Sequence, residues 1–227
     1  MSGRSPRWFT GIRGNYSDNF ADNTWEQIIE VCQKKIVPTS WKVGDQKAMT
    51  INAVDYLVDI IGINHDDYSD GFGKAPFTFQ LHDCYGELKN MNSSRTNVGG
   101  WASCSMRTVH LPAILALMPT EVKNSIREVN KLTSAGNRSA TINTTADKLF
   151  LLSEIEIFGS IAHSYSGEGT QYDYYKAGNS RAKGGADSWW ERSPSASDST
   201  HFCFVLRGNA SGSNANYATG VAFGFCF

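Results

Sequence analysis

The sequence lacks the features that mark a membrane-spanning or nucleic-acid-binding protein. No apolar run is long enough to cross a bilayer, and no apolar stretch follows the basic start Met-Ser-Gly-Arg-Ser-Pro-Arg. The formal net charge is -1 over 227 residues, so there is no basic footprint for nucleic acid. We therefore expect no signal peptide, synthesis in the cytoplasm, no nucleic-acid partner and no membrane insertion. Association with a virion or display on a surface stays open.

Cysteine is scarce, and the common catalytic motifs are missing. No CxxC pair occurs, which disfavours a zinc site of that type, and the five thiols are too scattered for a disulfide scaffold. P-loop, GxSxG and dinucleotide-binding motifs are also absent. The run NHDD at 64–67 does not have the spacing of a calcium loop. We expect reduced, mostly buried thiols, no catalytic residue, no metal and no cofactor.

Two small polar groups were candidates for chemistry. His82 and Cys84 point to the same face if their segment is a strand, but a Cys/His pair needs a third group to be catalytic. Glu154 and Glu156 share a face if 147–159 is a strand, and such a pair usually lies on a solvated sheet face. Neither group gives good evidence for an enzyme.

Apolar material is plentiful, at 41% of the residues with 12% aromatic, and its spacing predicts short elements. Thr24 and Gln27 form a capping box before an apolar helix that Pro38 stops. The segment WKVGDQKAMTIN, residues 41–52, reads as a hairpin turning at Gly44-Asp45. Residues 56–64 and 77–84 read as strands.

The second half of the chain continues in the same way. Residues 110–132 hold two helical pieces divided at Pro119, and the apolar run at 147–159 reads as a central strand. No repeat and no linker divides the chain. We predict an N-terminal extension over 1–20 and then one α+β domain over 21–227, with short antiparallel strands and two to three helices.

The last 35 residues have an unusual composition. Residues 193–227 contain no Lys, Gln, Glu, Met or Trp, which all occur earlier in the chain. By chance this has a probability of about one in a thousand. These five amino acids are also the ones that no codon ending in a pyrimidine encodes. Asn codons of the form AAY, altered only at their adenines, give many residue types but never these five and never a stop codon.

With this tail, the chain resembles a known family. The motifs that carry the resemblance are TWEQI, WKVGD, NHDD, GGWASCSMR, LMPTEV, DKLFLLSEIEIFG, QYDYYKAGNS, SWWERSP and GVAFGFCF. They resemble the variable proteins of diversity-generating retroelements, in which adenine-directed mutagenesis rewrites C-terminal codons, and especially the phage tropism determinants. The resemblance spans about residues 20–227. It implies a C-type lectin fold, of the branch that includes formylglycine-generating enzymes, with a variable region at about 187–227.

The resemblance divides the tail into a fixed frame and variable positions. The frame residues are Trp189, Trp190, Arg192, Phe202, Cys203, Val205, Gly220, Val221, Phe223, Phe225 and Cys226. On a strand, Cys203 and Val205 should face inward while Phe204 and Leu206 point outward. We call the fourteen predicted variable positions the variable slots: Ser195, Ser197, Asp198, Thr200, His201, Phe204, Leu206, Arg207, Ser211, Ser213, Asn214, Asn216, Tyr217 and Thr219.

The resemblance implies a diversified binding protein, encoded by a phage or a bacterium, that binds a host-cell or other target. Tyr, His, Phe and Arg among Ser and Asn is also the composition of an antibody paratope. The target is a protein or a glycan on a cell surface, and oligomerisation is left open. Three alternatives remain: a cysteine enzyme of the formylglycine-generating type, a structural tail subunit, and a Ser/Asn-rich loop with no partner.

Overall fold

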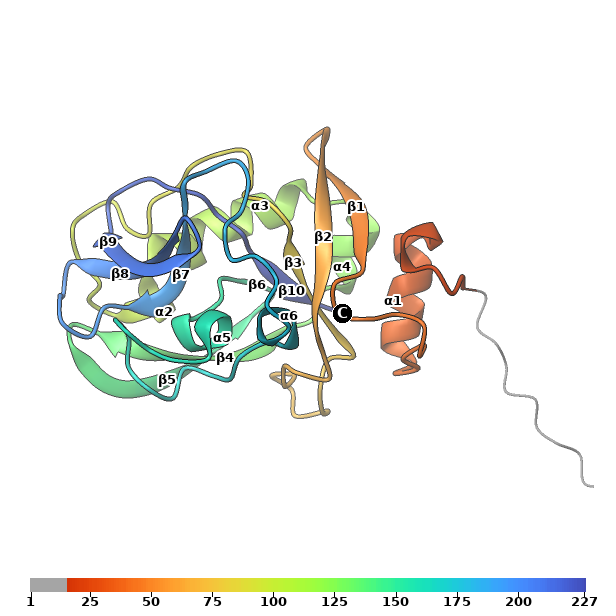
Figure 1. The fold of residues 1–227 in the computed structure, drawn as a ribbon, viewed down its shortest axis with the longest axis horizontal. Helices are drawn as coiled ribbons and strands as arrows, with labels where there is room; N and C mark the ends of the chain where they lie inside the picture. Colours follow the sequence, from red (N-terminus) through yellow and green to blue (C-terminus); the bar gives the residue numbers. More distant parts are fainter. Residues whose placement is uncertain (1–15) are drawn as a thin grey trace, which may run out of the picture.

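The final strand of the chain lies inside its largest sheet (Figure 1). The computed structural model describes residues 16–227. Strands β1 (Gln46–Ile51), β2 (Val54–Ile63), β3 (Phe77–Leu81), β10 (Gly224–Cys226) and β6 (Leu149–Phe150) form an antiparallel sheet in the order β1-β2-β3-β10-β6. The apolar end of the sequence is therefore core.

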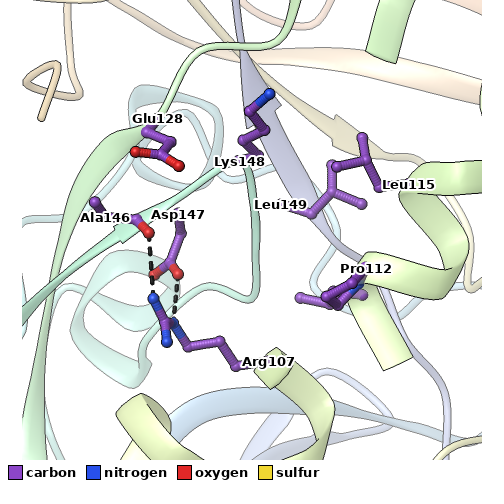
Figure 2. Close-up of a pocket in the computed structure, with 9 residues that line it drawn as sticks. Arg107, Pro112, Leu115, Glu128, Ala146, Asp147, Lys148 and Leu149 are labelled. Carbon is purple, nitrogen blue, oxygen red and sulfur yellow. Dashed lines mark hydrogen bonds and ion pairs between the residues drawn. The ribbon is translucent and has the colours of Figure 1, made fainter. Parts of the chain in front are cut away.

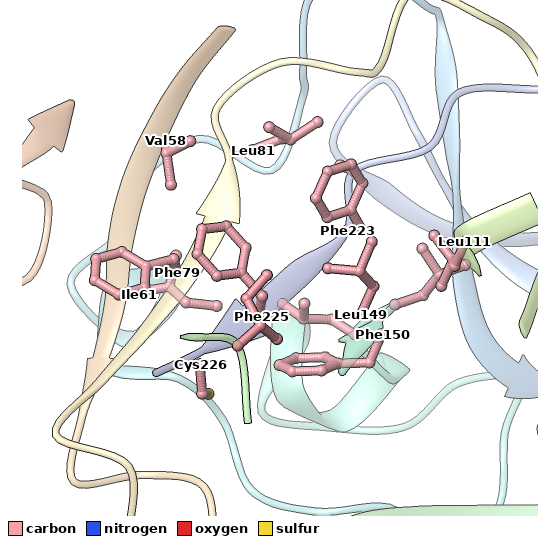
Figure 3. Close-up of a cluster of buried hydrophobic side chains, with 14 of the residues drawn as sticks. Val58, Ile61, Phe79, Leu81, Leu111, Leu149, Phe150, Phe223, Phe225 and Cys226 are labelled. Carbon is pink, nitrogen blue, oxygen red and sulfur yellow. The ribbon is translucent and has the colours of Figure 1, made fainter. Parts of the chain in front are cut away.

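The close fit of β10 between its neighbours depends on a glycine. A Cβ at Gly224 would lie 2.9 Å from the carbonyl oxygen of Phe79 and 2.8 Å from the ring of Phe150. Phe225, beside it, stacks on Phe79 with ring centroids 5.3 Å apart. Figure 3 shows these rings together with Phe223, around β10. Fully burying one such side chain is worth about 1.5–3 kcal/mol, so the last residues contribute strongly to stability.

The first hairpin turns later in the sequence than predicted. β1 and β2 pair in register from Gln46 with Asp59 to Ile51 with Val54, so the turn is at Asn52 and Ala53. Both turn residues have positive φ, at 49° and 61°. The predicted turn at Gly44-Asp45 is wrong: these residues precede β1, and the chain there does not reverse into a paired strand.

The first helix begins where its capping box predicts. In α1 (Trp25–Gln33), Thr24 accepts from the backbone of Gln27, and the Gln27 side chain accepts from the backbone of Thr24. The helix ends before the predicted stop at Pro38, and Ile36 is 50% exposed. Ahead of it lies a short turn of helix, η1 (Phe20–Asp22). Its Phe20 is buried against Trp41, so the packed fold includes residues before position 21.

Four short helical segments follow in the middle of the chain. They are α2 (Gly100–Ser103), η2 (Met106–His110), α3 (Leu111–Leu117) and α4 (Thr120–Ser125). The predicted division at Pro119 is confirmed, because α3 ends at Leu117 and α4 begins at Thr120. The second helical piece is shorter than predicted, since α4 ends at Ser125 and residues 129–132 belong to a strand. β4 (Val129–Gly136) and β5 (Ser139–Asp147) then form a separate hairpin. Among the described residues, no helix is long and apolar enough to cross a bilayer.

The predicted central strand at 147–159 is wrong. Only β6 is extended, and after it Ser153 caps α5 (Glu154–Phe158) in a second capping box with Glu156. Glu154 and Glu156 therefore lie on a helix, and both are buried rather than solvated. The last helix is α6 (Asp173–Lys176).

A three-stranded sheet forms the end of the molecule opposite α1 (Figure 1). Its strands are β7 (Ser188–Pro194), β8 (His201–Leu206) and β9 (Asn209–Asn214), in the order β7-β8-β9. Every residue of β7 is buried. The α+β class with short antiparallel strands is therefore confirmed, but the prediction of two to three helices is too low, since the described residues form α1 to α6. The biased tail supplies β8 and β9 of this sheet and the last core strand.

Candidate binding surface

The variable slots lie in three adjoining segments of the chain. They occupy the loop before β8, the β8–β9 hairpin and the loop after β9. β8 pairs with β9 over its whole length, from His201 with Asn214 to Leu206 with Asn209. This pairing brings slots from both strands onto one end of the molecule (Figure 1).

Eleven of the fourteen slots are at least partly exposed. Leu206 is 40% exposed and Tyr217 is 54% exposed, so the prediction that Leu206 points outward is confirmed. The exposed or half-buried slots are Ser197, Asp198, Thr200, His201, Leu206, Arg207, Ser211, Ser213, Asn214, Asn216 and Tyr217. They form a mixed surface of small polar groups with a few larger side chains.

Three slots are buried, and one expectation about orientation is wrong. Phe204 is only 7% exposed and packs on Trp190, with ring centroids 5.8 Å apart. Its neighbours Cys203 and Val205 are also buried. Strand β8 is therefore covered on both faces, and the alternation of a half-exposed strand does not apply. Ser195 and Thr219 are buried as well. In this conformation these three side chains do not contribute to the exposed surface.

The frame residues all lie in the interior. Trp189, Trp190 and Arg192 of β7 are at most 1% exposed. The frame residues on β8 and those of the final apolar run are buried too. The division into a buried frame and an exposed surface therefore holds for the frame as predicted, and for eleven of the slots.

Main-chain hydrogen bonds hold the slot-bearing loops. The amide of Ala215 donates to the Thr200 carbonyl at 2.8 Å, and the amide of Asn92 donates to the Ala215 carbonyl at 2.9 Å. Lys89 and Thr219 exchange two amide–carbonyl bonds of 3.0 Å each. These bonds use backbone atoms, so they do not depend on which side chains occupy the slots.

A buried asparagine outside the tail clamps the loop before β8. Asn97 is fully buried, and its side-chain amide donates to the carbonyls of Asp198 (2.9 Å) and His201 (2.7 Å). Its backbone amide donates to the Ser199 carbonyl at 2.7 Å. Its side-chain oxygen accepts from the amide of Asn137 at 2.8 Å. Asn97 thus binds three carbonyls, two through its side chain and one through its backbone amide. The role of Asn97 could not be predicted from the sequence. Its side chain binds backbone carbonyls, which every residue type carries, so no pattern of residue types indicates the contact.

Side chains within the same loop add a local network. Asp198 accepts from the hydroxyl of Thr200 at 2.7 Å and from its amide at 2.8 Å, and lies 2.9 Å from the Nδ1 atom of His201. The Thr200 bonds, with a smaller contribution from His201, lower the pKa of Asp198 to about 2. The carboxylate is therefore ionised at neutral pH.

Beneath the sheet lies a buried network of charges. Arg192 donates to both carboxylate oxygens of Glu156, and Lys131 lies 2.9 Å from Glu156 and 2.7 Å from Asp66. All four side chains are at most 5% exposed. Burial opposes the charge of Glu156, but Arg192 and Lys131 outweigh it and hold the pKa of Glu156 below its ordinary value. The network joins β4, α5 and β7.

Glu191, beside this network, has no hydrogen-bond partner for either carboxylate oxygen among the described residues. It is fully buried, and that burial, with the nearby carboxylates Glu154 and Glu168, raises the pKa of Glu191 well above its ordinary value. Burial also raises the pKa of Glu168 to about 7. An unpaired charge in such a place is costly, so Glu191 holds its proton in the folded state.

The raised pKa of Glu191 predicts in which direction the free energy of unfolding changes with pH. Because the folded state keeps a proton that the unfolded chain releases above about pH 4.3, the free energy of unfolding should fall as pH rises from there toward the folded pKa. The gain in stability from Glu191→Gln should therefore be larger at pH 8 than at pH 4.5, where wild-type Glu191 keeps its proton at little cost. Urea unfolding at a series of pH values measures this, with exposed Glu121→Gln as the control. A difference that does not change with pH would contradict the assignment.

The candidate ligand and nucleophile groups are already engaged or buried. Asp66 of the NHDD run binds Lys131, and Asp67 lies 3.0 Å from Lys74. His82 lies 2.9 Å from Asp59, while Cys84 is buried and its burial raises the pKa of the thiol to about 11. Over residues 16–227, no group of three or more His, Cys, Asp or Glu side chains is arranged to hold a metal ion.

All five cysteines are buried and unpaired, as expected. Burial raises the pKa of Cys203 and of Cys226 well above the ordinary thiol value, so neither forms a reactive thiolate near neutral pH. We expect a thiol reagent such as dithionitrobenzoate to label the native protein only as fast as it unfolds, and all five thiols to react at once in denaturant. Rapid labelling of both Cys203 and Cys226 in the native protein would instead favour the cysteine-enzyme alternative.

Cavities lie away from the variable slots. One of about 230 Å³ lies between α3 and the end of β5, and another of about 260 Å³ is lined by His65 and the buried charges of Asp66, Lys131 and Glu156. Figure 2 shows the first, with Pro112 and Leu115 on one side and Glu128 on the other. None of the fourteen slots lines either cavity.

Comparison with known proteins gives one match. A family profile described as "Domain of unknown function (DUF6273)" matches residues 72–226, about two thirds of the chain. This range includes all of the variable slots, Asn97 and the buried charge network except Asp66. No curated protein and no solved structure is found to be similar to the chain.

Proposed function

The chain belongs to the family of the DUF6273 domain, and we propose that it is a diversified binding protein with a C-type lectin fold, whose slot-bearing surface binds a target on a cell surface. The target is a protein or a glycan. The proposal rests on the resemblance to retroelement variable proteins and on the physical separation of frame from slots.

The observation that carries the proposal is how the slot-bearing loops are supported. Asn97 and the amides of Lys89 and Asn92 bind these loops only through their backbone. A substitution at an exposed slot therefore leaves these hydrogen bonds in place, and changes at exposed sites are usually close to neutral for stability. Backbone support of this kind suits a surface whose side chains vary while its main-chain conformation stays fixed.

The β8–β9 turn adds a second argument. Arg207 and Gly208 form a two-residue turn, with φ of 48° and 85°. Positive φ at both positions defines a type I′ turn, for which Asn-Gly is the preferred pair. An AAY codon at slot 207 encodes asparagine, so the unmutated codon would give Asn-Gly at this turn. Arginine is a less natural residue there, as expected for a position that has been changed.

The exposed slots have the chemistry of a paratope. Tyr217, Leu206 and Arg207 offer larger anchors, and they lie among serines and asparagines that can adapt their hydrogen bonds. A few anchors of this kind usually carry most of the binding energy of an interface. The identity of these anchors would set the target.

The flanking DNA tests the proposal. A near-copy of the sequence that encodes about residues 187–227 should lie close to the gene, with a reverse-transcriptase gene nearby. The copy should carry adenine wherever the two sequences differ, and it should encode mainly asparagine at the slots. The rest of the gene serves as the control, because it should have no such copy. Absence of the copy, or differences spread equally over all four bases, would contradict diversification and leave only a fixed binding protein.

A further inference from the structure

The helix formed by η2 and α3 exposes a mainly apolar face next to the exposed Thr108. Val109 is 58% exposed and Leu117 is 45% exposed, and Pro112, Ala113 and Ala116 between them are exposed too. Residues 108–118 contain no Asp, Glu, Lys or Arg. The opposite side of the helix, with Leu111 and Ile114, is buried in the core. Exposed apolar surfaces of this kind, rimmed by polar residues, often mark a contact surface.

Hollows flank the exposed face on both sides. Pro112 and Leu115 line the cavity of about 230 Å³ that also reaches Leu149 (Figure 2). Ala113 and Leu117, on the other side, line a hollow of about 90 Å³. Small side chains at 113 and 116 let another backbone approach closely. A ridge with a groove on each side is the shape onto which a second helix packs.

The rims of both hollows carry charges of both signs. Glu128 and Lys148 lie at the first, and within the described chain neither forms an ion pair. Glu87 and Lys89 lie at the second, paired with each other. A surface that carries both signs beside an apolar ridge can complement a copy of itself, since each copy brings a carboxylate and an ammonium group.

We propose that this face binds a second copy of the chain, with the α3 helices packed against each other about a two-fold axis. The choice of partner rests in part on the proposed function. Every residue of the face lies outside the variable region, so it presents the same surface in every variant. A target that differs between variants cannot be matched by a constant surface, whereas a second copy always can.

Pairing through α3 would display two slot-bearing surfaces on one particle. None of the fourteen slots lines either hollow, and the nearest link is Lys89 at the second hollow, which bonds to Thr219 through backbone atoms alone. Bivalent display raises apparent affinity by about 10²–10⁴-fold when both sites engage the same target surface. Newly varied surfaces bind weakly before selection, and this gain would make weak binders effective.

Sedimentation equilibrium of the full chain tests the proposal without any target. We expect a mass twice the 25.0 kDa of one chain at high protein concentration. Ala113→Glu should raise the dissociation constant of the dimer by about 100-fold or more, because it places an unpaired charge at the centre of the contact. Tyr217→Glu on the slot-bearing surface is the matched control and should leave the dimer unchanged. Leu117→Lys is a second test of the same face if Ala113→Glu does not fold by circular dichroism.

Two results would overturn the proposal. One is a wild-type chain that stays monomeric at every concentration. The other is a dimer that neither Ala113→Glu nor Leu117→Lys weakens. A dimer that only Tyr217→Glu dissociates would be one case of this result. Neither result bears on diversification, which the flanking DNA tests separately.

Discussion

Replacing Arg192 by methionine is expected to lower the free energy of unfolding by about 3–5 kcal/mol, the usual cost of removing one partner from a buried ion pair. Arg192 is fully buried, and its guanidinium binds both carboxylate oxygens of Glu156. It also donates to the carbonyls of Leu132, Leu151 and Glu168 and to the hydroxyl of Thr133. One side chain therefore ties β4, α5, β7 and the segment that follows β6 together.

The large cost arises from the groups that Arg192 leaves behind. Without it, buried Glu156 keeps only Lys131 as a counter-charge, and Lys131 is shared with Asp66. Methionine is long and apolar, so it fills most of the space that the arginine leaves. Most of the loss in the free energy of unfolding therefore comes from the missing charge and hydrogen bonds rather than from a cavity. Urea unfolding followed by tryptophan fluorescence measures it. If the variant does not accumulate as folded protein, Arg192→Lys keeps the charge and should give a smaller loss.

Arg207→Met is the matched control. This arginine belongs to the same tail, but its side chain is 74% exposed and its partner Asp187 is 76% exposed. An exposed pair of this kind contributes little, so the change should be within about 0.5 kcal/mol. Equal losses for the two arginines would contradict the central role of the buried network.

Local signals in the sequence predicted the elements that local interactions determine. The capping box of Thr24 and Gln27 marks the start of α1, and Pro119 marks the break between α3 and α4. A second capping box, Ser153 with Glu156, begins α5. The predicted strand rested on the apolar run around this motif and not on the motif itself. A capping box reports a specific pair of hydrogen bonds, so it marks the start of a helix more directly than an apolar run does.

Features that depend on distant partners could not be predicted in the same way. Glu156 is buried because Lys131 and Arg192, 25 and 36 residues away, compensate its charge. Phe204 is buried because β8 is covered on both faces, which its own alternation cannot reveal. The clamp by Asn97 leaves no signal, since it binds backbone carbonyls. The resemblance, by contrast, placed eleven of the fourteen slots at positions that are at least partly exposed.

Trp190→Ala is expected to cost about 3–5 kcal/mol, as for other large core aromatics. The indole is fully buried, packs on Phe204 and donates from Nε1 to the Lys89 carbonyl at 2.9 Å. Lys89 in turn exchanges two backbone hydrogen bonds with Thr219, in the loop after β9. Loss of the indole would therefore leave a cavity in the sheet and also remove a support of the slot-bearing loop.

Tyr217→Ala in that same loop should change the free energy of unfolding by no more than about 0.5 kcal/mol. Its side chain is 54% exposed, and the backbone bond from its amide to the Asn214 carbonyl is kept in the variant. Denaturant unfolding of both variants beside the wild type makes the comparison, with circular dichroism to check secondary structure. Two aromatic side chains 27 residues apart would then differ several-fold in their effect. A similar loss for both would mean that the slots help to hold the fold, and variation there could not proceed independently of stability.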